Sequence, residues 1–302
     1  MKIAITGASG LIGSALSERL VREGHSLLLF SRGNQAPETD RPEMRYFQVD
    51  LLEDFSPGYL EGIDVLINLA GVRIKSRHWS KSHRREIYDS RIITTRNLVK
   101  AINSCRKPPA VFISSSATGF YGSRGDELLD ERSGKGRGFL ADLTADWEAE
   151  ANAAMNAGSR VVCLRTAPVL SRRGGALPEL LKSFRPGFSS VLGNGSQWFP
   201  WIHIEDETGL ILKAIEDPGI VGPLNAVSPD SRTNRELMRA LGRQLGKPVF
   251  LSVPEGALKL VLGEVADEML LASQRVKPEK ALDSGYAFKF STLEDAFRDL
   301  LD

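Results

Sequence analysis

The sequence predicts a doubly wound α/β fold, in which helices cover both faces of a parallel sheet. Short apolar segments alternate with helical patterns through the first half of the chain, and a glycine-rich turn follows the first of these segments. The segments are hydrophobic at nearly every position rather than at every second one. This pattern is typical of strands buried on both faces, as in a parallel sheet.

Six segments have the length and composition of buried strands. They are "KIAITG" (2–7), "SLLLFS" (26–31), "RYFQVD" (45–50), "DVLINLAG" (64–71), "AVFISSS" (110–116) and "RVVCLRT" (160–166). Between them, apolar residues recur at helical spacing over 11–20 and 88–102. Strand and helix alternation predicts right-handed crossovers. Glycine and proline become frequent after residue 170, so we expect a dinucleotide-binding domain over 1–170 and a smaller mixed α/β lobe over 171–302.

The bulk composition is that of an ordinary soluble protein. The chain has 302 residues, 25% of them charged, and a formal net charge of +1, which gives no general attraction to nucleic acid or membrane. The start of the chain lacks the pattern of an export signal, and no apolar run approaches ~18 residues. Two cysteines are too few for a disulfide framework. We therefore expect a cytoplasmic protein.

The turn after the first strand has the spacing of a phosphate-binding loop. Gly7, Gly10 and Gly13 stand between a strand and an amphipathic helix. Glycine allows a tight turn and close approach of the backbone to a pyrophosphate, and the helix N-terminus offers free amides. This context predicts a Rossmann-type dinucleotide site. Ser9, Leu11 and Ile12 lie in the same loop and are predicted to contact the cofactor.

The end of the second strand predicts NADP rather than NAD. NAD sites of this kind usually carry an acidic residue there, for the ribose hydroxyls, whereas this chain has Ser31 and Arg32. A guanidinium can pair with a 2′-phosphate, which a carboxylate would repel. The ends of the third and fourth strands add further predicted cofactor residues: Asp50, Leu51, Leu69, Ala70 and Gly71.

The segment "FISSSATGFYG" (112–122) resembles the extended short-chain dehydrogenase/reductase superfamily, which includes UDP-galactose epimerase. The resemblance makes Ser116 the catalytic serine, and it places Ser114, Ala167 and Pro168 near the nicotinamide. The superfamily also uses a tyrosine and a lysine four residues later on the next helix. Here Leu140 and Thr144 occupy those positions, and none of the five tyrosines has a lysine at that spacing.

Further segments, including "GFYGSRGDE", "FLADLTADWE", "GNGSQWFPWIHIED" and "LLASQRVKPEKALDSGYAF", resemble an atypical branch of that superfamily. Its members are NADP binders of the "epimerase family", with a C-terminal domain of unknown function that 245–302 resembles. They are described as lacking the catalytic pair. Two hypotheses follow: an NADP(H)-dependent oxidoreductase- or epimerase-like protein in which Ser116 and Tyr121 act, or a non-catalytic NADP(H) sensor or scaffold acting through a protein partner.

Four residues are candidates for contact with a small, anionic substrate. Arg73 and Arg77 begin a basic stretch that either enters the cleft or forms a solvated helix face, and its charges are not interleaved with aromatics as in nucleic-acid binding. Trp198 either stacks on a substrate ring or belongs to the core. His203 is either a substrate contact or a packing residue. The histidines have no metal-ligand spacing, so we expect no metal site.

Overall fold

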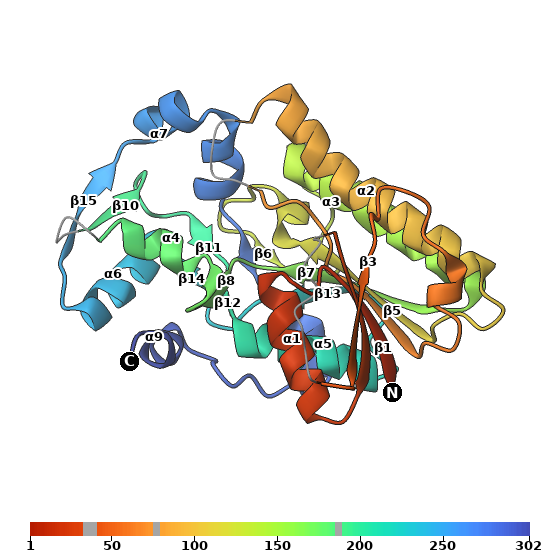
Figure 1. Cartoon of the computed structure of the whole chain (residues 1–302). Coiled ribbons are helices and arrows are strands. Elements are labelled where there is room, and N and C mark those ends of the chain that lie inside the picture. The colour runs from red at the N-terminus through yellow and green to blue at the C-terminus, as the bar shows by residue number, and fades with distance from the viewer. Residues whose placement is uncertain (33–40, 75–78, 185–188) are drawn as a thin grey trace.

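The computed structural model describes residues 1–32, 41–74, 79–184 and 189–302 (Figure 1). Within these ranges a seven-stranded sheet has the order β13-β7-β5-β4-β1-β2-β3, and all neighbouring strands in it are parallel. The predicted doubly wound fold is confirmed. The strands are β1 (Lys2–Thr6), β2 (Ser26–Ser31), β3 (Met44–Gln48), β4 (Val65–Asn68), β5 (Val111–Ala117), β7 (Arg160–Thr166) and β13 (Gly222–Ala226).

Helices cover both faces of this sheet, as the near-continuous apolar strands require. One face packs against α1 (Leu11–Arg22) and α5 (Ile204–Glu216), and the other against α2 (Lys81–Ser104) and α3 (Phe139–Asn152). Neighbouring strand residues serve opposite layers: Ile3 and Ile5 belong to the first core, and Ala4 to the second. Short helical turns η1 (Pro57–Tyr59), η2 (Thr118–Tyr121) and η3 (Ala153–Ala157) complete this part.

The seventh strand of the sheet, β13, lies beyond residue 170 in the sequence. β13 pairs with β7 from Gly222↔Val162 to Ala226↔Thr166, and α5 packs beside α1. The segment 204–226 therefore completes the sheet and one of its helical layers, although it follows the first part of the smaller lobe. The fold needs this later segment because β7 would otherwise be an exposed edge strand.

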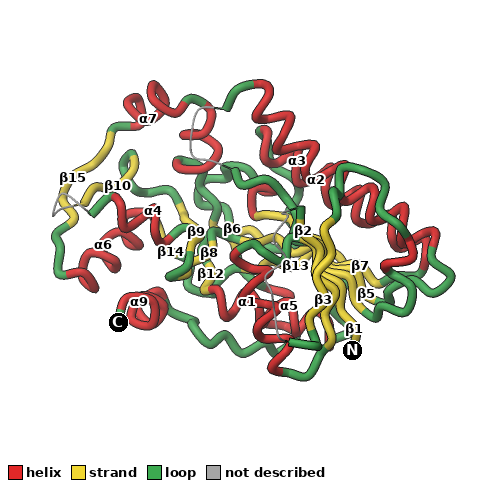
Figure 2. The backbone as a smooth tube through the Cα atoms, in the orientation of Figure 1, coloured by secondary structure: helices red, strands yellow, loops and turns green. Residues whose placement is uncertain are grey.

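The smaller lobe is built of short helices and strands (Figure 2), and its helices α4, α6 and α9 share an apolar cluster of their own. Its helical segments are α4 (Leu177–Lys182), α6 (Asn234–Leu245), α7 (Glu255–Leu262), the π-helical turn η4 (Ala266–Leu270), α8 (Glu279–Asp283) and α9 (Leu293–Leu301). Its strand groups are β12 (Ile202–His203) with β8 (Val169–Ser171) and β9 (Gly174–Gly175), β10 (Ser189–Leu192) with β15 (Val249–Val253), and β11 (Trp198–Phe199) with β14 (Arg232–Thr233).

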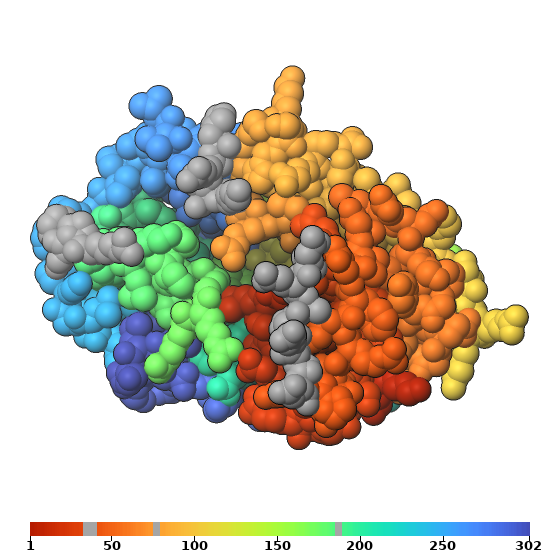
Figure 3. Space-filling model, in the orientation of Figure 1, coloured from red at the N-terminus to blue at the C-terminus, as the bar shows by residue number. Residues whose placement is uncertain are grey.

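A pair of short strands connects the part that contains the large sheet with the smaller lobe. β6 (Leu128–Leu129), which follows the end of β5, pairs with β16 (Arg275–Val276) near the C-terminus. In Figure 3 the C-terminal part, green to blue, lies directly beside the N-terminal part, red to yellow. None of the helices in the described ranges is both long and apolar enough to span a bilayer.

Candidate functional site

A cavity of about 320 Å³ lies at the carboxyl edge of the parallel strands. This is the edge at which ligands bind in open α/β sheets. Its walls come from the β1–α1 turn, the ends of β2, β3 and β4, and one face of α2. The lining residues are Gly7, Ser9, Gly10, Phe30, Ser31, Arg32, Asp50, Leu51, Leu52, Leu69, Ala70, Gly71, Ser90 and Thr94.

The glycine turn is shaped by close backbone packing. Gly7 has φ +68°, and a Cβ at this position would lie 2.5 Å from the carbonyl oxygen of Leu69. A Cβ on Gly13 would lie 2.4 Å from the carbonyl oxygen of Gly7. Gly10 is the N-cap of α1 and supplies no side-chain cap, and Leu11 and Ile12 form the first turn. The amides at this helix start are therefore left for an anionic ligand, which the partial positive charge of the helix favours.

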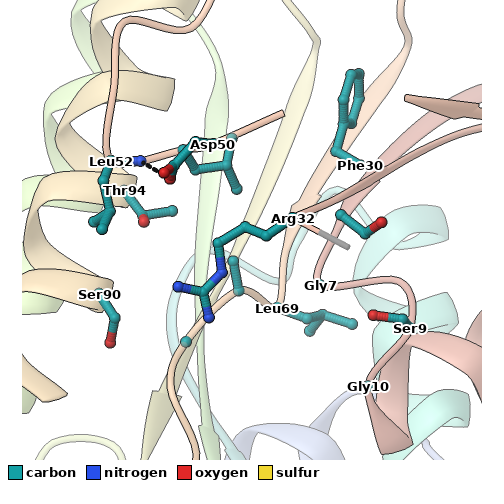
Figure 4. A pocket seen from close by; sticks show the side chains of 14 residues that line it. Gly7, Ser9, Gly10, Phe30, Arg32, Asp50, Leu52, Leu69, Ser90 and Thr94 are labelled. Carbon is teal, nitrogen blue, oxygen red and sulfur yellow. Dashed lines mark hydrogen bonds between the residues drawn. The ribbon is translucent and has the colours of Figure 1, made fainter. Parts of the chain in front are cut away.

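The residue predicted to select the cofactor points into this cavity. In Figure 4 the Arg32 guanidinium extends between the Asp50–Thr94 side of the cavity and the Gly7–Leu69 side. Asp50 is held by its own turn, because its Oδ1 accepts the Leu52 amide at 3.0 Å. The last position of β2 is Ser31, so the cavity has a cation and no carboxylate where NAD sites usually carry an acid.

The buried side-chain amide of Asn68 fixes the carboxyl end of β4. Asn68 Oδ1 accepts the Thr6 hydroxyl at 2.7 Å, and Asn68 Nδ2 donates to the Thr95 hydroxyl at 3.0 Å. The amide of Ala70 lies 3.3 Å from the same Oδ1. These bonds hold the backbone of 69–71 against the cavity.

Four lining residues were not predicted from the sequence. Ser90 and Thr94 are one helical turn apart on α2, and Phe30 and Leu52 are next to predicted residues. A pair of small polar residues at a spacing of four, within an otherwise apolar helix face, was the available signal for the α2 contribution.

Ser116 belongs to a buried network beyond the cavity. Its hydroxyl donates to Glu148 Oε1 on α3 at 2.6 Å, and Glu148 also pairs with Arg165 on β7, at 2.8 Å from Nε and 2.9 Å from Nη2. Arg165 is 3% exposed, and its Cζ lies 3.6 Å from the ring centre of Phe120. We call Ser116, Tyr121, Glu148, Arg165 and Asn225 the buried network.

Tyr121 lies fully inside this network. Its side chain has no exposed surface, and its hydroxyl lies 2.7 Å from Asn225 Oδ1 and 2.9 Å from the carbonyl oxygen of Asp130. Arg165 Nη1 donates to the same hydroxyl at 2.9 Å. Burial raises the pKa of Tyr121 to about 12, although the Arg165 charge acts in the opposite direction. The phenol stays protonated at neutral pH and presents no exposed face to a ligand.

Helix α3 corresponds to the helix on which the superfamily has its tyrosine and lysine. Its N-terminus is capped by a residue of the smaller lobe. The amides of Phe139 and Leu140 donate to the Glu268 carboxylate of η4, at 2.8 and 3.0 Å. Thr144, at the lysine position, is buried, and its hydroxyl donates to the carbonyl oxygen of Leu140 at 2.7 Å. A carboxylate is favourable at a helix N-terminus. The start of α3 is thus capped by the protein itself.

The remaining predicted residues lie apart from the cavity lining. Ser114 is fully buried in β5, and Ala167 and Pro168 follow β7, where the amide of Ala167 donates to the carbonyl oxygen of Ala226. Arg73 is exposed, and Arg77 lies outside the described residues. Sequence proximity to strand ends is therefore insufficient to place a residue on the cavity.

The two aromatic candidates of the smaller lobe have partners within the protein. The Trp198 indole N–H donates to Asp126 at 2.7 Å, and the Arg275 guanidinium lies 4.4 Å above its ring. His203 is 1% exposed and caps α5, since its Nδ1 accepts the Glu205 amide at 3.1 Å. Burial lowers the pKa of His203. The structure gives His203 a packing and capping position rather than a place on the cavity.

No group of three or more His, Cys, Asp or Glu side chains suited to a metal ion occurs in the described ranges. The fold and the glycine-lined cavity define a protein of the dinucleotide-binding α/β class. The sequence profile of the NAD dependent epimerase/dehydratase family matches residues 3–223, and the chain belongs to this family. A domain of unknown function, DUF1731, matches residues 253–300, within the predicted terminal segment.

Similar proteins are known from bacteria to mammals. Epimerase family protein Mb2239 of Mycobacterium bovis is 38% identical, over 97% of this chain and 95% of that protein. Epimerase family protein YfhF of Bacillus subtilis is 35% identical, over 100% of this chain and 98% of that protein. The crystal structure of human epimerase family protein SDR39U1 with NADPH has a TM-score of 0.86 and 31% identity, and 99% of each chain is covered. The predicted atypical branch is confirmed.

Proposed function

We propose that this chain binds NADP(H) in the cavity, with the pyrophosphate at the start of α1 and the 2′-phosphate at Arg32. The observation that carries the proposal is the Arg32 guanidinium, which enters the cavity at the end of β2, where an acid would select NAD (Figure 4). The space that a Cβ at Gly7 or Gly13 would fill supports a closely bound dinucleotide. The NADPH in the human relative agrees with this assignment.

We further propose that the protein is an oxidoreductase- or epimerase-like enzyme acting on a small molecule. Bound NADPH supplies a hydride. The contribution of the chain is to bind the dinucleotide, to fix the end of β4 through Asn68, and to hold the carboxyl end of β5 rigid through Ser116. Ser116 and Tyr121, which the sequence suggested as catalytic, are positioning residues in this proposal because their hydroxyls bond within the buried network.

A specific observation favours the second hypothesis, a cofactor-binding sensor or scaffold without catalysis. The first two N-terminal amides of α3, those of Phe139 and Leu140, are occupied by Glu268, and the Tyr121 phenol is fully buried. A protein of this kind would order a surface for a protein partner when NADPH binds. A cytoplasmic location remains a prediction from the sequence in either case.

The two hypotheses are separated by a turnover assay on the NADPH complex. NADPH and NADH binding is measured by calorimetry, and the NADPH complex is then mixed with a panel of carbonyl compounds while absorbance of the reduced nicotinamide is followed. Oxidation with any compound establishes an enzyme. Tight NADPH binding without oxidation across the panel favours the sensor.

The same assay tests the role of Tyr121. Because the phenol is buried and remains protonated, Tyr121→Phe should leave turnover within about twofold, and it should destabilise the fold by about 1–3 kcal/mol, since buried partners of the hydroxyl lose their hydrogen bonds. A general acid or base typically contributes ~10²–10⁴ in rate. A loss of turnover of that size, in a variant with unchanged NADPH affinity, would show that Tyr121 transfers a proton.

A further inference from the structure

A partly buried cation lies beside the lining of the cavity. Arg91 follows the lining residue Ser90 on α2, and its Cζ would lie 3.3 Å from a Cβ placed on Gly71, another lining residue. Its Nη1 donates to the carbonyl oxygens of Ile87 at 3.1 Å and Val72 at 3.2 Å. The guanidinium is therefore held at the point where β4 ends, next to the cavity.

Only one nitrogen of this guanidinium, Nη1, donates hydrogen bonds to described residues. Nη1 makes the two bonds to carbonyl oxygens and lies 3.4 Å from the Ser90 hydroxyl, whereas Nε and Nη2 have no hydrogen-bond acceptor among the described residues. The ring centre of Trp147 lies 5.2 Å from Cζ. An aromatic ring at this distance stabilises a cation and leaves the planar fork free to bind oxygen atoms at its edge.

Arg91 also has no counter-charge, unlike its counterpart in the buried network. Within the described ranges no carboxylate forms an ion pair with Arg91, and burial lowers its pKa to about 10. Burial acts in the same direction on Arg165, but the hydrogen bond and the charge of Glu148 help to outweigh it, so the pKa of Arg165 is raised. Charges that are largely removed from water are normally paired in proteins, so an unpaired, partly buried guanidinium beside a ligand cavity indicates an anionic ligand.

We propose that Arg91 binds the anionic group of the substrate, a carboxylate or a phosphate, at the end of the cavity beside Gly71. This inference rests on the proposed function and adds a substrate class to it. Two oxygens of such a group match the free edge of the guanidinium, and charge-assisted pairs of this geometry are among the strongest hydrogen bonds in proteins. Arg91 is thereby a substrate-binding residue in a region where the superfamily's own pair is absent.

Anion binding to the NADPH complex tests this assignment. Oxalate and inorganic phosphate serve as probes for the two chemistries, and each is titrated by calorimetry into the complex at constant ionic strength. Three proteins are compared: wild type, Arg91→Met, and Arg85→Met as the matched control. Arg85 lies on the same helix but is exposed, with its partner Asp89 one turn away.

We expect at least one probe to bind the wild-type complex, and we expect its affinity to fall at least tenfold in Arg91→Met and to stay within twofold in Arg85→Met. The affinity for NADPH should be similar in all three proteins. The probe that binds identifies the substrate group as carboxylate or phosphate. An equal loss in both variants would show general charge attraction and would overturn the inference.

Two other results would also overturn it: no binding of either probe, or a tenfold loss of NADPH affinity in Arg91→Met, which would assign Arg91 to the cofactor instead. Failure of the wild type to bind NADPH would contradict the proposed function itself and is read separately. If Arg91→Met does not fold, Arg91→Lys keeps the charge and loses the planar fork. That variant should weaken probe binding and leave NADPH affinity unchanged, and unaltered probe binding would contradict the proposal.

Discussion

The nucleotide cavity and the buried network lie at the same edge of the sheet, but they are built in opposite ways. The cavity is lined by glycines, small side chains and the exposed Arg32, whose guanidinium extends into open space (Figure 4). In the buried network, Ser116, Tyr121, Glu148 and Arg165 bond to one another or to neighbouring backbone, and each is less than a tenth exposed. The first region leaves polar groups for a ligand, whereas the second satisfies them internally.

The serine-rich segment resembles a catalytic segment, and in the structure the Ser116 hydroxyl connects β5 to Glu148 of α3, which pairs with Arg165 of β7. Substitutions in the network should therefore act mainly on stability, and substitutions around the cavity mainly on binding.

The largest stability effect is expected from Glu148→Ala. It leaves Arg165, which is 3% exposed, without its counter-charge, and removal of one partner of a buried ion pair typically costs about 3–5 kcal/mol. Urea unfolding measures the change. Glu150→Ala on the same helix is the control, because Glu150 pairs with the largely exposed Arg96 and such pairs contribute at most about 1 kcal/mol. Equal effects in the two variants would mean that the network does not hold the fold.

The second largest effect is expected on NADPH binding in the cavity. Gly7→Ala places a Cβ 2.5 Å from the carbonyl oxygen of Leu69 at φ +68°, so the turn must move and NADPH binding should be lost. Gly24→Ala separates the two causes, since Gly24 has φ +82° but no atom within 4 Å of the added Cβ. That control should lose about 1 kcal/mol of stability and keep its NADPH affinity. Retained binding in Gly7→Ala would contradict the cavity assignment.

A smaller effect, which depends on pH, is expected at Glu207. This side chain is fully buried, its Oε1 accepts the Thr166 hydroxyl at 2.8 Å, and its Oε2 has no partner in the described ranges. Burial raises the pKa of Glu207 to about 8 from the usual 4.5. Between these values the folded state binds more protons than the unfolded chain, so the free energy of unfolding falls as pH rises.

Glu207→Leu removes this penalty. The variant should be more stable than wild type by about 1–3 kcal/mol at pH 8, and the advantage should shrink towards pH 5. Thermal unfolding of both proteins across this pH range measures it. Glu205→Leu, two residues earlier in the same helix but exposed, should show no such trend, and a pH-independent difference for Glu207→Leu would contradict the raised pKa.

The sequence predicted what depends on local pattern. Buried strands are continuous apolar runs, so six strands of the sheet were found, whereas "GPLNA" was missed because it begins with glycine and proline and contains a polar asparagine. The glycine turn and Arg32 were predicted because their chemistry follows directly from strand ends. Ser90 and Thr94 were missed because their spacing on α2 is only a weak local signal, and tertiary packing decides that this face of the helix lines the cavity.

The burial of Tyr121 was beyond prediction for a related reason. A tyrosine after a serine-rich strand end suggests a residue in an active site, but the turn η2 directs the ring into the core, where Asn225 and Arg165 meet its hydroxyl. These partners are separated from Tyr121 by 104 and 44 residues, so no spacing rule connects them.

The most direct test of the account compares NADPH and NADH affinity in wild type, Arg32→Ala and Arg22→Ala by calorimetry. Arg22 is an exposed arginine in the last turn of α1, away from the cavity. We predict that wild type prefers NADPH and that Arg32→Ala loses about 10–100-fold in NADPH affinity, as expected for a charge-assisted pair, with NADH affinity unchanged. Arg22→Ala should match wild type. Equal affinity of the wild type for both dinucleotides, or no change of preference in Arg32→Ala, would contradict the account.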